Sequence, residues 1–70
     1  MKLIVNGEPR DTDAPDLDAL WREETRELDL AGPQGFAIAH NGAVVRKAAW
    51  RETPLGEGDR VDIIRAMQGG

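Results

Sequence analysis

The sequence predicts one small α+β domain, with a mixed sheet of four to five strands covered by one main helix. Three observations predict this class: a length of 70 residues, two Asn-Gly dipeptides that each follow a β-prone run, and a single amphipathic stretch between them. A chain of this length buries only about 60% of the surface that it exposes when unfolded, so it has no room for a second core. We expect a domain over residues 1–66 and a flexible tail over residues 67–70 that ends in Gly-Gly.

Both Asn-Gly dipeptides predict a β-hairpin. Residues 2–5 are β-prone and end at Asn6-Gly7, the dipeptide that best tolerates the positive φ angles of a two-residue type I′ turn. The same pattern recurs where residues 35–40 run into Asn41-Gly42 and then residues 43–45. We therefore expect one hairpin at the start of the chain and a second one beyond its middle.

One helix is expected between the hairpins. Asp16 can cap its first turn, and the spacing of the residues that follow places three large apolar side chains on one face: Leu17, Leu20 and Trp21. The apolar stripe then weakens before Leu28 resumes it, so we expect the helix to end between Arg26 and Leu28.

The last third of the chain predicts a short helical turn, a loop and a strand. Residues 47–50 favour the turn, and residues 53–59 carry the Pro and Gly residues of a connecting loop. From residue 60 to residue 66 apolar and polar residues alternate, which is typical of a half-buried strand.

This order of elements favours a β-grasp packing. In that arrangement the first and last strands lie side by side in parallel at the sheet centre, and the helix crosses over the sheet between them. The predicted core consists of large apolar side chains at inward positions: Leu3, Val5, Leu17, Leu20, Trp21, Leu28, Phe36, Ile38, Val45, Leu55, Val61 and Ile63.

Composition excludes several classes of protein. The chain has no cysteine, so it has no disulfide framework, zinc finger, iron–sulfur cluster or thiol nucleophile. A formal net charge of −4 disfavours nucleic acid and anionic membranes as partners, because both require a positive field, and makes basic protein surfaces the better candidates. No apolar run reaches about 18 residues and no signal segment is evident, so we expect a cytoplasmic protein.

Side chains for catalysis or metal binding are scarce. His40 is the sole histidine, and the chain has no serine for it to activate. We interpret it as a residue at the rim of the second hairpin. Four aspartates lie close together in the sequence but lack the glycine and terminal glutamate of a calcium loop, which favours a solvated acidic surface: Asp11, Asp13, Asp16 and Asp18. We expect a protein that is not an enzyme and that binds no metal or cofactor.

The end of the chain is its unusual feature, because a predicted strand runs into Met67, Gln68, Gly69 and Gly70. These four residues span roughly 13 Å when extended, enough to carry a terminal carboxylate into the cleft of another protein. The two glycines lack Cβ atoms and therefore fit a narrow channel. A carboxylate is a poor electrophile, so acyl chemistry at Gly70 requires activation, which we expect as a mixed anhydride with AMP formed by a separate enzyme. The alternative is a frayed end without a function.

Alternation along the strands also predicts an apolar strip on the sheet face away from the helix. If Leu3, Val61 and similar residues point inward, their sequence neighbours point outward. A contiguous exposed apolar surface on a small acidic domain indicates docking. The predicted docking face is Ile4, Ala37, Ala39, Ile64 and Ala66.

From His40 onward the chain resembles the sulfur carriers of thiamine biosynthesis, the ThiS family. The resemblance rests on the order and spacing of several short motifs: Asn41-Gly42-Ala43-Val44-Val45, Trp50, Thr53, Leu55, Gly58-Asp59-Arg60-Val61-Asp62-Ile63-Ile64 and Met67-Gln68-Gly69-Gly70. It extends more loosely over the rest of the chain.

This resemblance implies a ubiquitin-like β-grasp fold and a set of partners. A ubiquitin-activating-type enzyme would adenylate the terminal glycine with ATP, and a cysteine desulfurase persulfide would supply the sulfur of a thiocarboxylate. The thiocarboxylate would then deliver sulfur to thiazole synthase. Carried onto this sequence, Gly70 is the acceptor, Gly69 its steric companion, and Met67 and Gln68 thread the channel of the partner.

Three alternatives stay open at this point. The small subunit of molybdopterin synthase uses the same thiocarboxylate on a similar fold but is usually longer. A ubiquitin-like modifier would form an isopeptide bond from Gly70 to a lysine. A non-covalent binding module would carry its Gly-Gly end incidentally.

Overall fold

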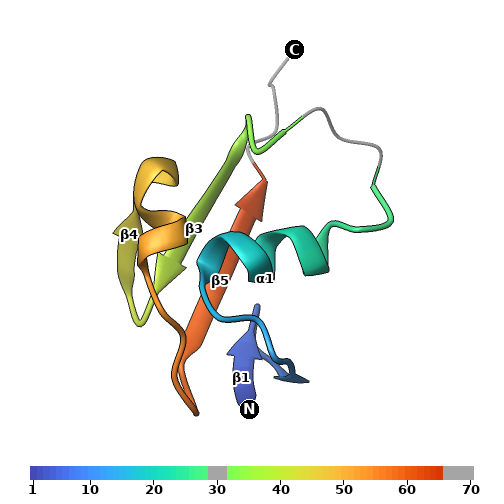
Figure 1. Ribbon diagram of the computed structural model, residues 1–70, viewed down its shortest axis with the longest axis vertical. Helices are drawn as coiled ribbons and strands as arrows, with labels where there is room; N and C mark the ends of the chain where they lie inside the picture. Colours follow the sequence, from blue (N-terminus) through green and yellow to red (C-terminus); the bar gives the residue numbers. More distant parts are fainter. Residues whose placement is uncertain (29–31, 66–70) are drawn as a thin grey trace.

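The computed structural model describes residues 1–28 and 32–65 and contains a sheet, one α-helix and one 3₁₀-helix (Figure 1). Strands in chain order are β1 (Lys2–Val5), β2 (Glu8–Asp11), β3 (Phe36–His40), β4 (Ala43–Val45) and β5 (Arg60–Arg65). The helix α1 (Leu17–Glu24) follows β2, and the 3₁₀-helix η1 (Lys47–Glu52) follows β4. Among the described residues, no helix has the length and apolar content needed to cross a membrane.

The sheet has the order β2-β1-β5-β3-β4, so the first and last strands are central neighbours. β1 and β5 run parallel, with Ile4 beside Arg60 and Val5 beside Val61, whereas β5 and β3 run antiparallel. The helix α1 covers one face of this sheet (Figure 1). The predicted fold class is therefore confirmed, with five strands.

Both Asn-Gly dipeptides form the predicted turns. The φ angles are 51° at Asn6 and 81° at Gly7, and 50° at Asn41 and 89° at Gly42. Two successive positive φ angles are the signature of a type I′ turn, whose twist matches that of the flanking strands. The turns connect β1 to β2 and β3 to β4.

The two turn asparagines also bind β5 directly. Asn6 Oδ1 accepts a hydrogen bond from the backbone N–H of Ile63 at 2.7 Å, and its own backbone N–H donates to the Val61 carbonyl at 2.9 Å. Asn41 Oδ1 accepts from the backbone N–H of Arg60 at 2.9 Å, and its N–H donates to the Arg60 carbonyl at 2.8 Å. The first turn therefore adds hydrogen bonds to β5 beyond the end of β1, and the second turn adds them beyond the end of β3.

The helix begins as predicted and ends earlier than predicted. Asp16 caps it, because its Oδ1 accepts a hydrogen bond from the Ala19 N–H at 2.8 Å. At the other end Thr25 leaves the helical conformation, and its hydroxyl donates to the Trp21 carbonyl at 2.7 Å. The expected end between residues 26 and 28 was wrong, because Thr25 has a non-helical backbone, with φ −110° and ψ 12°, directly after Glu24.

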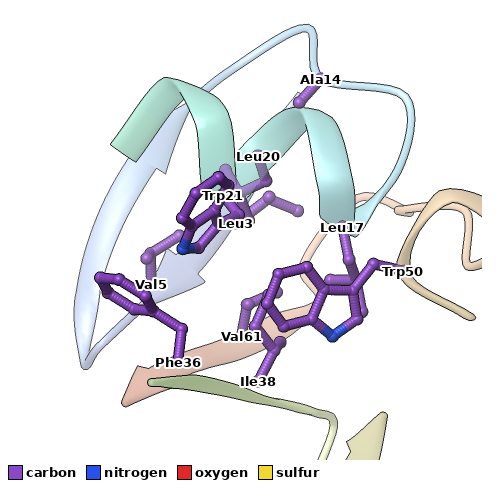
Figure 2. Packing of buried hydrophobic residues seen from close by; sticks show 10 residues of the cluster. All are labelled: Leu3, Val5, Ala14, Leu17, Leu20, Trp21, Phe36, Ile38, Trp50 and Val61. Atoms are coloured by element: carbon purple, nitrogen blue, oxygen red, sulfur yellow. The ribbon is translucent and has the colours of Figure 1, made fainter. Parts of the chain in front are cut away.

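Ten apolar residues form the buried core between α1, η1 and the sheet, as Figure 2 shows. Their members are Leu3, Val5, Ala14, Leu17, Leu20, Trp21, Phe36, Ile38, Trp50 and Val61. The ring of Trp21 meets that of Phe36 edge to face, with 5.4 Å between centroids, and lies 6.1 Å from that of Trp50. The two tryptophans and Phe36 thus connect both helices to the sheet.

One prediction about the core was wrong, and two core residues, Ala14 and Trp50, were not predicted. Leu28 is 47% exposed, because the helix that would have turned it inward stops at Glu24. Trp50 was not predicted in the core, yet it is only 1% exposed and its Nε1 donates a hydrogen bond to the Val45 carbonyl at 2.9 Å. Val45, Leu55 and Ile63, which were predicted as core, are half-buried and pack against its edge.

Candidate docking face and the strand that leads to the tail

Strand β5 carries the chain from the centre of the sheet toward the predicted tail. The structure describes it to Arg65, whose guanidinium carbon lies 5.6 Å from the centroid of the Phe36 ring. A cation over an aromatic face is attracted by the ring quadrupole, so this contact restrains the end of β5. The remaining predicted site residues lie outside the described residues: Ala66, Met67, Gln68, Gly69 and Gly70. The tail and the domain boundary at residue 66 therefore stay predictions.

The structure places the other residues of the predicted docking face on the sheet face away from α1. Ile4 is 37% exposed and Ile64 is 55% exposed. Ala37 pairs directly with Ile64 across β3 and β5, and it is exposed, whereas Ala39 is half-buried. Directly paired residues lie on the same face of a sheet, so Ala37 and Ile64 are neighbours on that face.

Val44 belongs to the same face, although it was not predicted there. It pairs with Ala39 across β3 and β4, and its side chain is 78% exposed. The signal was present in the sequence, because an inward Val45 requires an outward Val44 in an alternating strand. We call the group Ala37, Ala39, Val44 and Ile64 the outer patch.

Ile4 lies apart from the outer patch. Ile4 pairs with Arg60, and along β5 the outward residues after Arg60 are Asp62 and Ile64. Arg60 Nε and Asp62 Oδ2 form an ion pair at 3.2 Å, which separates Ile4 from Ile64. The expected contiguous strip is thus divided by one exposed ion pair.

His40 and Asp59 join the second hairpin to the loop before β5. His40 Nε2 donates to Asp59 Oδ2 at 2.8 Å, since an ionised carboxylate accepts only. The same carboxylate accepts from the Gly56 N–H at 2.8 Å and from Asn41 Nδ2 at 3.3 Å. The hydrogen bond from His40, followed by that from Gly56, lowers the pKa of Asp59 below its ordinary value. His40 is thus a structural residue at the rim of the hairpin.

Three of the four aspartates predicted as an acidic surface have separate local roles. Asp16 caps α1, Asp18 pairs with Arg22 at 3.0 Å, and Asp11 lies 3.3 Å from the N-terminal ammonium of Met1. In the part of the chain that the structure describes, no three acidic, His or Cys side chains are grouped so as to hold a metal ion. The same part encloses no pocket for a small molecule. What the structure presents beside the strand that leads to residue 66 is the exposed apolar outer patch.

A five-stranded mixed sheet with parallel central β1 and β5, crossed on one face by a single main helix, defines a ubiquitin-like β-grasp protein. The ThiS family model matches residues 3–70, and the chain belongs to the ThiS family. This match includes the last residues of the sequence.

Two solved structures agree with this assignment. The chain resembles the crystal structure of thiamine biosynthesis protein ThiS from Geobacter metallireducens with 29% identity, full coverage of both chains and a TM-score of 0.71. It resembles the NMR solution structure of a thiamine biosynthesis protein from the same organism with 29% identity and a TM-score of 0.67. That comparison covers 100% of this chain and 88% of the other. Comparison with the curated proteins gave no match.

Proposed function

We propose that this protein is a cytoplasmic sulfur carrier that donates sulfur for thiazole formation in thiamine biosynthesis, and that it is a co-substrate and not an enzyme. The observation that carries the proposal is the family match over residues 3–70, which reaches the terminal Gly-Gly. The similar Geobacter proteins are described as thiamine biosynthesis proteins, which supports the choice of pathway.

Gly70 supplies the reactive group in this proposal. Its carboxylate attacks the α-phosphorus of ATP on a ubiquitin-activating-type enzyme, pyrophosphate leaves, and a mixed anhydride with AMP forms. The outer sulfur of a persulfide then attacks the activated acyl carbon and AMP leaves, which gives an acyl disulfide. A thiol attacks the cysteine-side sulfur of this disulfide, so that a new disulfide forms and the thiocarboxylate is released; inorganic sulfide in place of the persulfide gives the thiocarboxylate in one step. ATP is bound by the activating enzyme, and a cysteine desulfurase persulfide is the proposed source of sulfur.

The rest of the tail allows this chemistry. Met67 and Gln68 pass through the channel of the partner, and Gly69 leaves room for the nucleotide because it has no Cβ atom. After sulfur transfer the same tail enters thiazole synthase. The outer patch, with Ile4 beyond the Arg60–Asp62 ion pair, provides the surface on which either enzyme docks.

The test is the intact mass of the protein after incubation with the activating enzyme, ATP and a sulfide source. We expect a mass gain equal to the replacement of one oxygen atom by one sulfur atom, located at Gly70 by fragmentation. Without ATP the mass is expected to stay unchanged, because the free carboxylate does not react with sulfide.

The control is a variant that lacks Gly70. We expect it to gain no sulfur and to support no thiazole synthesis, with its folded domain intact by circular dichroism. Thiazole synthesis that persists in this variant would contradict the proposal. A ladder of adducts on other proteins in place of the mass gain would indicate a ubiquitin-like modifier instead.

A further inference from the structure

Positive charge is concentrated at one side of this acidic domain. The segment that forms β4 and η1 carries three exposed cations, Arg46, Lys47 and Arg51, against a single exposed carboxylate, that of Glu52. This segment lies at the opposite edge of the sheet from β2 (Figure 1). The acidic residues described above lie mainly on β2, α1 and the segment between them. The net charge of −4 therefore conceals a cationic side.

The carboxylates on the outer face of the sheet are already engaged. Asp62 pairs with Arg60 at 3.2 Å, and Asp11 lies 3.3 Å from the N-terminal ammonium. Among residues 1–28 and 32–65, by contrast, the side chains of Arg46, Lys47 and Arg51 form no ion pair. The cations beside β4 are thus available to an external carboxylate.

Arg46 borders the outer patch. Its extended backbone, with φ −64° and ψ 147°, continues the alternation of β4, so Arg46 lies on the same side as Val44. Continuing the register by one residue from Ile38–Val45 places Arg46 beside Ala37, which itself pairs with Ile64. Ala37 and Ile64 form one row across β3 and β5, and the continued register places Arg46, the residue after β4, at the end of this row. Ile64 precedes the predicted tail by only a few residues.

We propose that Arg46 and the outer patch form one docking surface for a protein face with an apolar centre and a carboxylate at its border. The inference rests on the proposed function, in which the activating enzyme is that partner. It differs from the expectation of a basic partner, which considered net charge alone. At physiological ionic strength charges separated by more than about 8 Å are largely screened, so the local Arg46 outweighs the distant acidic residues at the contact.

Arg46→Glu tests the proposal, with Arg26→Glu as the matched control. Both substitutions change the net charge equally, but Arg26 lies in the turn after α1, away from the sheet face. The dissociation constant for the activating enzyme is measured by surface plasmon resonance over a range of salt concentrations. We expect Arg46→Glu to weaken binding by about tenfold or more and Arg26→Glu by less than about twofold. Only Arg46→Glu should reduce the salt dependence.

A further variant, Val44→Asp, examines the apolar part and should weaken binding as strongly as Arg46→Glu. Thermal unfolding of each variant verifies that the domain is folded. The inference is overturned if Arg46→Glu binds the activating enzyme as tightly as the wild type, or if Arg26→Glu loses as much affinity as Arg46→Glu. In either case a mass gain at Gly70 leaves the proposed function standing. A wild type that neither binds the activating enzyme nor gains sulfur would instead refute the proposed function, and the inference with it.

Discussion

Asn6 and Asn41 each occupy a positive-φ turn position and also supply a hydrogen-bond acceptor to β5. Either property alone explains an asparagine in a type I′ turn, but only the second connects the turn to another strand. Each asparagine therefore serves both its turn and a contact with a strand that is distant in the sequence. The Asn-Gly pattern alone indicates only the turn.

Asn6→Gly separates the two properties of Asn6. Glycine adopts a φ of 51° without strain but lacks the oxygen that accepts from the Ile63 N–H. We expect the free energy of unfolding to fall by about 1 kcal/mol, the usual net contribution of one hydrogen bond. Urea denaturation measures this change. The control Asn6→Asp keeps an acceptor oxygen and should stay closer to the wild type; equal stability of the glycine and aspartate variants would contradict the role given to the side chain.

Asp59 gives the domain a specific acid sensitivity. Its pKa in the folded state lies below the ordinary 3.8, mainly because of the hydrogen bond from His40. A carboxyl group with a lowered folded pKa stabilises the folded state fully above its unfolded pKa, and this contribution disappears as the pH falls through the folded pKa.

Asp59→Asn isolates that contribution. At neutral pH the variant should be less stable than the wild type, and the difference should close as the pH falls below 3.8. Urea denaturation of both proteins at a series of pH values gives the comparison, and other carboxyl groups cancel because both proteins contain them. If the difference in the free energy of unfolding stays constant down to strongly acidic pH, Asp59 stabilises the fold through its shape and not through its charge.

Among the elements, α1 shows that apolar spacing alone does not determine where a helix ends. Leu28 continues the apolar spacing of the helix, but the hydroxyl of Thr25 bonds back to Trp21 and the helix ends at Glu24. Leu28 is exposed as a result, whereas Leu20 on the same stripe is fully buried.

Alanine substitutions at these two leucines should therefore differ in cost. We expect Leu20→Ala to lower the free energy of unfolding by about 2–5 kcal/mol, or to leave the domain unfolded, because it opens a cavity in the core. Leu28→Ala should cost less than about 1 kcal/mol, as is usual for an exposed position. Chemical denaturation distinguishes them, and similar losses at both positions would mean that α1 continues past Thr25 in solution.

At the scale of the whole molecule, the fold was largely predictable because its signals are local. The Asn-Gly turns, the Asp16 cap and the alternation in β1 and β5 depend on neighbours in the sequence. The order of the predicted strands and helix along the chain then favours β-grasp packing.

The features that escaped prediction depend on contacts between distant segments. Trp50 is buried because η1 turns it onto α1 and its Nε1 finds the Val45 carbonyl. The ion pair of Arg60 and Asp62 divides the outer face only because the register of β1 on β5 places Ile4 beside Arg60. For the candidate site, the sequence predicted the outward positions of Ile4, Ala37, Ala39 and Ile64 but overlooked Val44 and the border residue Arg46.

The parallel pairing of β1 and β5 has a mechanical consequence. A pull on the chain beyond Arg65, resisted at Met1, loads the hydrogen bonds between the two strands in shear, so they share the force and do not open one after another. The turn of Asn6, which also binds β5 at Val61 and Ile63, adds to the row under load. We therefore expect the domain to resist a pull along β5 better than a force that peels the two strands apart.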